Sequence, residues 1–383
     1  MYLEDKQLKK VKVLVIYPFL HHYRLGVFRE MDKTEGYEYT FVSGLEGQRG
    51  IKALSSDAVS NHEYAPVRVV GPFSWQSKVP PMLSRWDYDA VIFLADIPSI
   101  STWIGAAIAR SRRKPVLFWT IGWHRPESGI KRILRNSFYR LSNMLLLYGE
   151  LGKSIGTQMK FPPERMSVIG NSVETASAEK SQSEDWHFMK PPKTYVIGAV
   201  IRLTPVKHLD LLIRAAAQVV QDDPTIELKI LLVGEGPERD KLQQLADELK
   251  IDLVMPGALY GARALTNVYE AMDVTVVPSA VGLTAIQSMS HGVPVISNDS
   301  AYTQMPEWES IKPGITGELF PEGDVHGLAA AIRRLTALSA EQRNEMAINC
   351  KLEVQNNWSA EVQAKRLANI ISEYFPETRP RSA

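Results

Sequence analysis

The sequence predicts an α/β protein built from two doubly wound parallel sheets. Short apolar runs of strand type alternate with segments of helical spacing, which is the pattern of parallel sheets. The alternation stops in a polar stretch at 175–193, which contains two prolines and is interpreted as a linker, and it resumes at Tyr195. A chain of 383 residues with 45% hydrophobic content is also long for a single core. We therefore expect domains at 1–174 and 194–358, followed by a C-terminal helix within 359–383.

The first series begins with an apolar run at 11–18. This run is too short for a signal-peptide core with its cleavage site or for a membrane span, so it is interpreted as the first strand. Helical patterns separate it from later runs of the same kind, and the strand candidates lie at 11–18, 39–43, 91–95, 116–121, 144–148 and 166–169.

The second series contains the most informative window, VTVVPSAVGLTAIQSMSHGVPVISND at 274–299, which predicts a strand, a turn, a helix and another strand. In a parallel sheet such a helix begins at the carboxyl end of a strand, where its free N–H groups favour an anion. Ser279, Ala280 and Gly282 are small enough for a phosphate to approach this backbone closely. After Asp324 the pattern becomes helical, at 326–338, 340–354 and 359–375.

Charge is distributed unevenly, although the whole chain has a net charge of only +1. Residues 1–185 contain 25 Lys and Arg against 19 Asp and Glu, whereas the remainder contains 19 against 24. The basic excess is concentrated at 110–114 and in IKRILRNSFYRL at 130–141. The latter predicts a basic amphipathic helix that either contacts an anionic membrane surface or packs its apolar stripe on its own sheet. Nucleic-acid binding is not expected, because extended interleaving of basic and aromatic residues is absent.

Several classes of site are excluded by composition and spacing. A single cysteine, Cys350, excludes an intrachain disulfide and fits a reducing cytoplasm. Motifs of zinc metalloproteases, P-loop NTPases and serine hydrolases do not occur. Asp87 and Asp89 form a D-Y-D pattern, but they precede a strand, whereas a ligand site would follow one. We therefore expect no metal site.

Four segments together resemble glycosyltransferase family four, the retaining enzymes of the GT-B fold, in which two Rossmann-like domains enclose an interdomain cleft. Besides the window at 274–299, these are IGAVIRLTPVKHLDLLIRAA at 197–216, LKILLVGEGPERDKL at 228–242 and MPEWESIKPGITGELFPEGD at 305–324. The resemblance is strong from Tyr195 to about residue 338 and weak in the first half. It implies a C-terminal helix that returns to the N-terminal domain, and it is closest to the surface-polysaccharide and lipid-linked glycan branch.

The resemblance also implies a donor site in the second half. Arg202 and Lys207 match the pair that clasps the nucleotide diphosphate and offsets charge on the leaving group. The family has two glutamates where this chain has Ser279 and Gln287, and an amide can still hydrogen-bond a ribose. The complete set implied to contact the donor is Arg202, Lys207, Gly234, Gly236, Pro256, Ser279, Gly282, Leu283, Thr284, Gln287 and Glu307.

Two loops of the first half complete the candidate site. His124, in WTIGWHRPESG, matches a histidine that contacts the donor sugar, or it is a structural histidine. The loop after the first strand contains His21, His22, Tyr23 and Arg24, which supply donors for an acceptor hydroxyl or phosphate, or which form the polar start of a helix.

The resemblance therefore predicts a metal-independent, retaining hexosyltransferase. It would use a UDP- or GDP-linked sugar without any further cofactor, and would act on a glycan or lipid-linked acceptor in the cytoplasm or at the inner face of the membrane. Two alternatives stay open. One is a sugar-nucleotide epimerase of the same fold, and the other is a non-catalytic partner subunit, suggested by Ser279 and Gln287.

Overall fold

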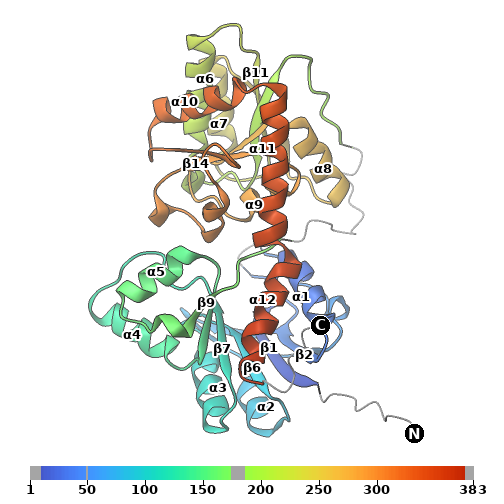
Figure 1. Ribbon diagram of the computed structural model, residues 1–383, viewed down its shortest axis with the longest axis vertical. Helices are drawn as coiled ribbons and strands as arrows, with labels where there is room; N and C mark the ends of the chain where they lie inside the picture. The colour runs from blue at the N-terminus through green and yellow to red at the C-terminus, as the bar shows by residue number, and fades with distance from the viewer. Residues whose placement is uncertain (1–9, 49–50, 174–185, 376–383) are drawn as a thin grey trace. The chain divides into compact units, whose positions relative to one another are not determined.

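The computed structural model describes residues 10–48, 51–173 and 186–375. The chain forms two compact units, of which unit 1 comprises Met1–Glu174 with Ala360–Ala383 and unit 2 comprises Thr175–Ser359 (Figure 1). Each unit contains a parallel sheet covered by helices, so the predicted α/β class with two doubly wound sheets is confirmed.

The sheet of unit 1 has seven strands in the order β3-β2-β1-β6-β7-β8-β9, and all neighbours are parallel. Its central strands are apolar on both faces, as expected for a sheet between two layers of helices. All six strand candidates correspond to strands. A short strand beside β2 and a separate hairpin were not predicted. The strands are β1 Val11–Phe19, β2 Tyr37–Gly44, β3 His62–Tyr64, β4 Arg68–Val70, β5 Phe73–Trp75, β6 Ala90–Leu94, β7 Val116–Thr120, β8 Met144–Leu147 and β9 Met166–Val168.

The last helix of the chain, α12, is part of the core of unit 1. Leu367 and Ile371 are fully buried in the same hydrophobic cluster as β1 and β2. Gln363 anchors the start of the helix, because its Nε2 donates to the Gly170 carbonyl at 2.6 Å. The helices of unit 1 are α1 Leu25–Asp32, α2 Val79–Arg85, α3 Ile100–Ser111, α4 Gly129–Tyr139, α5 Glu150–Gln158 and α12 Ala360–Ser372.

The sheet of unit 2 has six parallel strands in the order β12-β11-β10-β13-β14-β15. Counted within the unit, this is the order 3-2-1-4-5-6 of dinucleotide-binding sheets, in which the direction of winding reverses between the first and fourth strands. Here that switch point lies between β10 and β13. The strands are β10 Tyr195–Val200, β11 Leu228–Val233, β12 Asp252–Gly257, β13 Val274–Val276, β14 Val295–Asn298 and β15 Gly317–Phe320.

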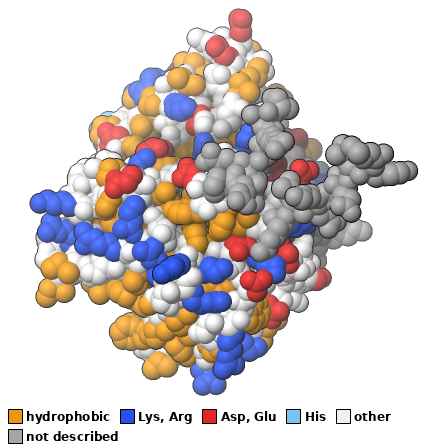
Figure 2. Space-filling view, turned by 60° about the horizontal axis from the view of Figure 1, so that its bottom comes forward, with side chains coloured by type: hydrophobic (Ala, Val, Ile, Leu, Met, Phe, Trp, Pro, Cys, Tyr) orange, Lys and Arg blue, Asp and Glu red, His pale blue; other side chains and the backbone are white. Residues whose placement is uncertain are grey.

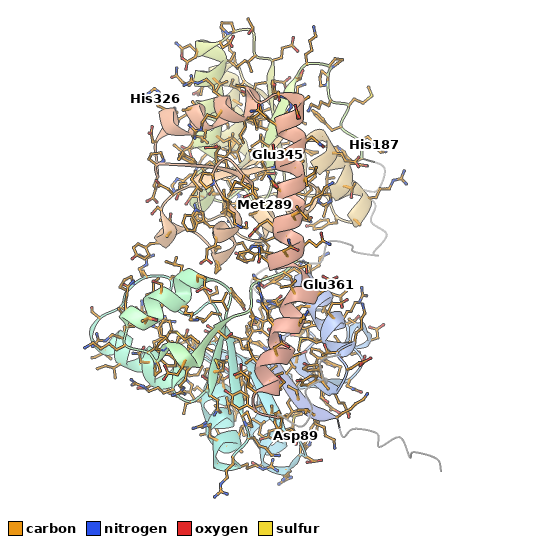
Figure 3. All side chains as sticks on the ribbon, viewed as in Figure 1. Asp89, His187, Met289, His326, Glu345 and Glu361 are labelled. Atoms are coloured by element: carbon orange, nitrogen blue, oxygen red, sulfur yellow. The ribbon has the colours of Figure 1, made fainter. Side chains whose placement is uncertain are left out.

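Helices on both faces complete unit 2: α6 Leu209–Asp222, α7 Arg239–Leu249, α8 Ala262–Ala271, α9 Leu283–Ser290, α10 Val325–Thr336 and α11 Ala340–Glu353. Met289 of α9, labelled in Figure 3, is fully buried. Residues 175–185 of the predicted linker lie outside the described part of the chain. The remaining part packs on unit 2, where Trp186 and Phe188 contact a cluster that includes Tyr269.

Candidate functional site

The loop after β10 carries two cations at the switch point of unit 2. Arg202 is exposed, and its guanidinium makes no hydrogen bond or ion pair with any residue that the structure describes. Lys207 ends the short helix Pro205–Lys207, and its Nζ donates to the Ala280 carbonyl at 2.5 Å. Ala280 follows β13, so Lys207 bridges the loops of the two strands that flank the switch point. One cation is thereby free to meet a ligand, and the other is held in place.

The side chain of Lys207 is partly buried and lies near the acidic residue Glu307. Burial lowers the pKa of its ammonium group, and the carboxylate of Glu307 opposes this shift. Glu307 is only 2% exposed and lies in the short helix Pro306–Ser310. Its Oε2 would be 3.8 Å from a Cβ placed on Gly282. Glu307, Lys207 and the start of α9 are therefore close to one another.

Close backbone packing explains why glycine occurs at two positions after β11, which the sequence did not show. A Cβ on Gly234 would lie 1.9 Å from the Ile201 carbonyl oxygen, and one on Gly236 would lie 2.1 Å from that of Leu203. Both distances are impossible, so these positions accept only glycine. Their absent side chains let the loop after β11 pack directly against the loop that carries Arg202. Contact of these glycines with a donor remains a prediction.

The turn before α9 is held rigidly by a segment that sequence analysis did not identify. The Gln304 side chain accepts from the Val281 N–H at 2.7 Å and donates to the Asn298 carbonyl at 3.0 Å. The Asn298 amide donates to the Pro278 carbonyl at 2.7 Å. The Met305 N–H donates to the Val281 carbonyl at 3.2 Å. Gln304 precedes the MPE segment, and only that position in the sequence could have suggested its role.

Helix α9 begins beside β10. The Thr284 hydroxyl donates to the Val200 carbonyl at 3.2 Å, which fixes the first turn of the helix at the carboxyl end of that strand. Leu283 starts the helix and is half-buried. One turn later, the half-buried side-chain amide of Gln287 makes no hydrogen bond with the described residues. Ser279 is buried, and Pro256 lies half-buried in β12.

In unit 1, the loop after β1 contains a buried arginine without a carboxylate partner. Arg24 is 3% exposed, and its Nη2 donates to the Tyr148 hydroxyl at 2.5 Å. Its guanidinium also lies 4.9 Å from the ring centres of Trp119 and Tyr148. Its Nε and Nη1 are buried without a hydrogen-bond partner. The arginine therefore lies behind this loop, at the carboxyl ends of β1, β7 and β8.

The neighbours of Arg24 form the outer part of the same loop. Tyr23 and His21 are joined through the tyrosine hydroxyl and Nδ1 at 2.8 Å. Burial lowers the pKa of His21 to about 3, and Arg24 and His22 shift it in the same direction. His21 is therefore neutral at physiological pH. His22 is exposed, and its Nδ1 lies 3.3 Å from the Lys52 carbonyl oxygen.

His124 lies in the turn after β7 and is exposed. Loss of surrounding water lowers the pKa of its imidazole, and the charges of Arg135 and Arg125 add to this effect. Trp119 and Trp123, which precede His124 in the sequence, are both buried core residues.

The D-Y-D pattern lies at the amino end of β6. Asp89, labelled in Figure 3, accepts from the Lys12 N–H at 2.9 Å, and Asp87 forms an ion pair with the Lys12 ammonium at 2.8 Å. Both carboxylates thus hold the start of β1. Within the described ranges, no group of three or more His, Cys, Asp and Glu side chains could hold a metal ion.

Comparison with known proteins agrees with this geometry. Residues 194–337 match the family described as Glycosyl transferases group 1. The matched residues all lie in unit 2 and make up less than half of the chain. A D-inositol 3-phosphate glycosyltransferase of Thermomonospora curvata is 26% identical over 345 residues, which cover 86% of this chain and 76% of the relative.

Two solved structures share the architecture of almost the whole chain. A glycosyltransferase of Rickettsia africae has a TM-score of 0.73 at 16% identity, with 96% of this chain and 99% of that chain covered. The Anabaena protein HepE, solved in complex with UDP and glucose, has a TM-score of 0.69 at 17% identity, with coverage of 95% and 100%. The fold is GT-B. Identities this low establish the GT-B fold alone, so the role of each site residue remains a prediction.

Proposed function

We propose that this protein transfers a sugar from a nucleotide diphosphate sugar, UDP- or GDP-linked, to a glycan or lipid-linked acceptor in surface polysaccharide assembly. The observation that carries this proposal is the arrangement at the switch point of unit 2. Exposed Arg202, the bridging Lys207 and the N-terminus of α9 are brought together there by adjacent strands. Such a combination of cations and free N–H groups is suited to a diphosphate.

The same arrangement suggests how the reaction is promoted. When the bond between sugar and diphosphate breaks, negative charge grows on the leaving group, and preorganised cations stabilise that charge. Arg202 supplies a guanidinium that can bind two phosphate oxygens, and Lys207 supplies a point charge fixed against Ala280. We infer that these two groups perform the role of a metal ion, and that the configuration of the sugar is retained.

Further residues would complete the two substrate sites. Gln287 is placed to hydrogen-bond the ribose, because its amide has no other partner among the described residues. Glu307 and His124 are proposed to contact the donor sugar. The loop of unit 1 at residues 21–24, which contains His21, His22, Tyr23 and Arg24, is proposed to contact the acceptor, since it follows β1 at the carboxyl edge of the sheet.

The experiment is a two-stage assay on the full chain. Thermal shift with UDP, GDP and a panel of their sugars identifies the donor, because a ligand that binds only the folded state raises the melting temperature. Turnover with the donor and candidate acceptors then gives a product whose anomeric configuration is read by NMR. Addition of EDTA should leave the rate nearly unchanged. Absence of stabilisation by every nucleotide and sugar nucleotide would refute the proposed donor site.

The alternatives give different products in the same assay. An epimerase of the GT-B fold would release a rearranged sugar nucleotide without any acceptor. A non-catalytic partner subunit would bind the donor without turnover, and the uncharged Ser279 and Gln287 are the feature that favours it. A new glycosidic bond to the acceptor excludes both alternatives.

We further propose that helix α4 rests on an anionic membrane surface. Ile130, Ile133 and Leu134 have 84%, 63% and 48% of their surface exposed, and their spacing places them on one face of the helix. Lys131 and Arg132 lie beside them, which gives the combination of apolar and basic groups found in interfacial helices. Figure 2 shows Lys and Arg side chains interspersed with hydrophobic ones on the forward face. The apolar stripe therefore does not pack wholly on its own sheet.

Vesicle sedimentation tests this contact. No helix among the described residues is long and apolar enough to cross a membrane. Replacing Ile130 and Ile133 by serine should release the protein from phosphatidylglycerol vesicles, because α4 would lose the apolar side chains that it buries in the membrane interface. Ile348→Ser, at a 49% exposed isoleucine of α11, is the matched control. If the double variant sediments like the parent protein, α4 is not the contact.

A further inference from the structure

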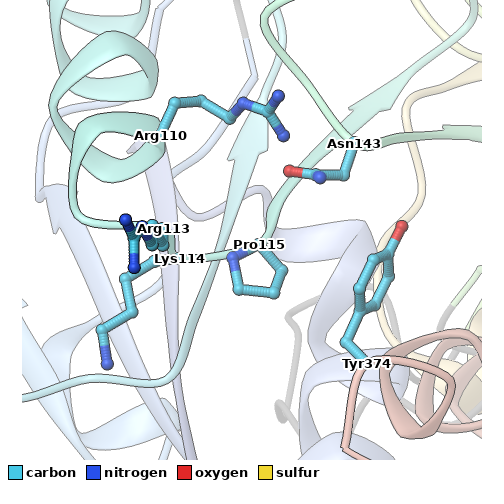
Figure 4. A pocket seen from close by; sticks show the side chains of 6 residues that line it. All are labelled: Arg110, Arg113, Lys114, Pro115, Asn143 and Tyr374. Carbon is cyan, nitrogen blue, oxygen red and sulfur yellow. The ribbon is translucent and has the colours of Figure 1, made fainter.

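A pocket of about 350 Å³ lies at the opposite edge of the unit 1 sheet from the acceptor loop (Figure 4). Pro115 and Asn143 directly precede β7 and β8, so the pocket lies at the amino ends of these strands. The complete lining is Arg110, Arg113, Lys114, Pro115, Asn143 and Tyr374. None of these residues belongs to the proposed donor and acceptor sites, so any ligand here would act apart from the reaction.

The polar groups of this pocket are nearly all hydrogen-bond donors, and no carboxylate lines it. Figure 4 shows the Arg110 guanidinium and the Tyr374 hydroxyl pointing toward Asn143. The Asn143 amide oxygen already accepts from the Val116 N–H at 3.0 Å, which leaves the NH₂ group to donate. Lys114 is partly neutralised by Asp89 at 3.9 Å. The Arg110 and Arg113 side chains have neither a hydrogen bond nor an ion pair among the described residues.

Further positive charge lies next to the pocket, where Glu164 only partly offsets it. Arg165 donates to the carbonyl groups of Arg140 and Asn143, at 3.1 and 3.3 Å, and this holds it beside the pocket. Burial lowers the pKa of Arg165, and the nearby charges of Arg110 and Arg140 lower it further. Cations that repel one another in this way are stabilised when an anion binds between them.

The turn that carries Arg113 closes the C-terminus of α3, and the Lys114 N–H donates to the Ala109 carbonyl at 3.0 Å. Arg113 has φ of +58°, and its N–H donates to the Arg110 carbonyl just after the end of α3. A left-handed residue commonly closes a helix in this position, and it is most often glycine. The helix C-terminus accounts for favourable placement of cations. The helix C-terminus does not explain why the Tyr374 hydroxyl points toward Asn143 at the same pocket.

We propose that this pocket binds a phosphate group through Arg110, Arg113, Asn143 and Tyr374. A phosphate has several acceptor oxygens and matches two guanidinium groups, an amide and a hydroxyl that all donate. The volume admits a phosphate with a small group attached to it. The phosphate comes either from a phospholipid headgroup or from a free phosphate compound, and the two sources share this chemistry.

Hydrogen exchange of the full-length protein, read by mass spectrometry, locates the binding. Peptides that cover 108–116 and 140–146 are followed in chloride, in inorganic phosphate at matched ionic strength, and with vesicles of phosphatidylcholine with or without phosphatidylglycerol. The variant is Arg110→Gln. Its control is Arg214→Gln, at an exposed arginine of α6 that forms no hydrogen bond or ion pair with the described residues.

Phosphate should slow exchange of these two peptides in the parent protein and in the control. In Arg110→Gln the phosphate concentration for half-protection should rise at least tenfold, which corresponds to loss of about 1.4 kcal/mol. Protection by phosphatidylglycerol vesicles alone assigns the site to a lipid headgroup, and protection by inorganic phosphate assigns it to free phosphate compounds. The proposal would be overturned if neither inorganic phosphate nor phosphatidylglycerol vesicles slowed exchange of these peptides. Equal protection of Arg110→Gln and the parent protein would also overturn it.

Discussion

Arg202 and Lys207 are five positions apart, yet their surroundings differ. Arg202 is exposed and unpaired among the described residues, whereas Lys207 is partly buried and bonded to Ala280. An exposed guanidinium can swing onto a ligand as it binds. A bonded lysine instead links the ligand to the loop after β13. At the scale of single residues, substitution of Arg202 and substitution of Lys207 should therefore have different effects on the protein.

Arg202→Gln should lower kcat/KM at least tenfold, about 1.4 kcal/mol of transition-state stabilisation, with an unchanged melting temperature. Stability should be preserved because the guanidinium has no partner to lose among the described residues. Steady-state kinetics and calorimetry on the same preparation measure both quantities. Activity within twofold of the parent would remove Arg202 from the diphosphate site.

Lys207 should make donor binding sensitive to alkaline pH. Because burial lowers the pKa of Lys207, its charge is lost at a pH below the ordinary lysine value of 10.5. Affinity for a nucleoside diphosphate should therefore be full below the lowered pKa and fall as the pH rises through it. Lys207→Arg keeps its charge over this range, so its affinity should not show the fall. Calorimetric titrations across pH compare the two proteins, and identical profiles would contradict the assignment.

Gln287→Ala should weaken donor binding by roughly 1 to 3 kcal/mol, because ribose hydroxyls would be left without their partner. Gln287→Glu should be tolerated, since the carboxylate has the same reach. Binding of the bare nucleoside diphosphate is measured by calorimetry for both variants. Equal affinity of Gln287→Ala and the parent would show that α9 does not meet the ribose.

At the scale of elements, the loop before α9 depends on a partner from another part of unit 2. The turn Pro278–Gly282 follows β13, and residues from the end of β14 onward, namely Asn298, Gln304 and Met305, form hydrogen bonds with it. Ser279, Ala280 and Gly282 have small or absent side chains, so the turn depends on these hydrogen bonds for its conformation. Gln304 therefore acts as a positioning residue for the backbone that is proposed to face the diphosphate.

Gln304→Met should destabilise the protein by about 1 to 3 kcal/mol, because the Val281 N–H would be buried without an acceptor. It should also raise KM for the donor more than it lowers kcat, since the binding loop loses its support. Urea denaturation and kinetics measure these effects. Gln244→Met, at an exposed glutamine of α7 bonded to Glu248, is the control and should change neither quantity. Unaltered KM in Gln304→Met would show that the loop does not depend on this side chain.

At the scale of the whole molecule, the chain enters unit 1, passes through unit 2 and returns with α12 (Figure 1). The C-terminal helix supplies fully buried residues to a core whose other members come from the first strands. The stability of unit 1 therefore depends on residues that follow the whole of unit 2 in the sequence.

Leu367→Ala should destabilise unit 1 by about 2 to 5 kcal/mol, the usual cost of a cavity left by a buried leucine. Unit 2 should be unaffected, so nucleotide binding should keep its parent affinity. Calorimetric unfolding and a nucleotide titration measure the two outcomes. Leu352→Ala, at an exposed leucine of α11, is the control. Equal melting of Leu367→Ala and the parent would contradict the role of α12 in this core.

The sequence by itself determined the two-sheet α/β fold and the positions of the internal strands of unit 1. These strands are continuous apolar runs because both of their faces are covered, and such runs are visible locally. The short edge strand His62–Tyr64 was missed, since half-exposed residues carry no such signal. The sequence also placed Arg202, Lys207 and Ser279 after strands. Parallel pairing then brings such positions to one edge of a sheet.

Only the tertiary structure decided which side chains are available and which are structural. Burial of Arg24, exposure of Ile130 and the bond from Gln304 to Val281 all depend on contacts between residues far apart in the chain. The Tyr37 hydroxyl and the Ala368 carbonyl, which are hydrogen-bonded at a separation of 331 residues, are an extreme case. Local periodicity records whether a residue faces a core, because that choice repeats along one element. It cannot record the partner, because the partner is set by how distant elements pack.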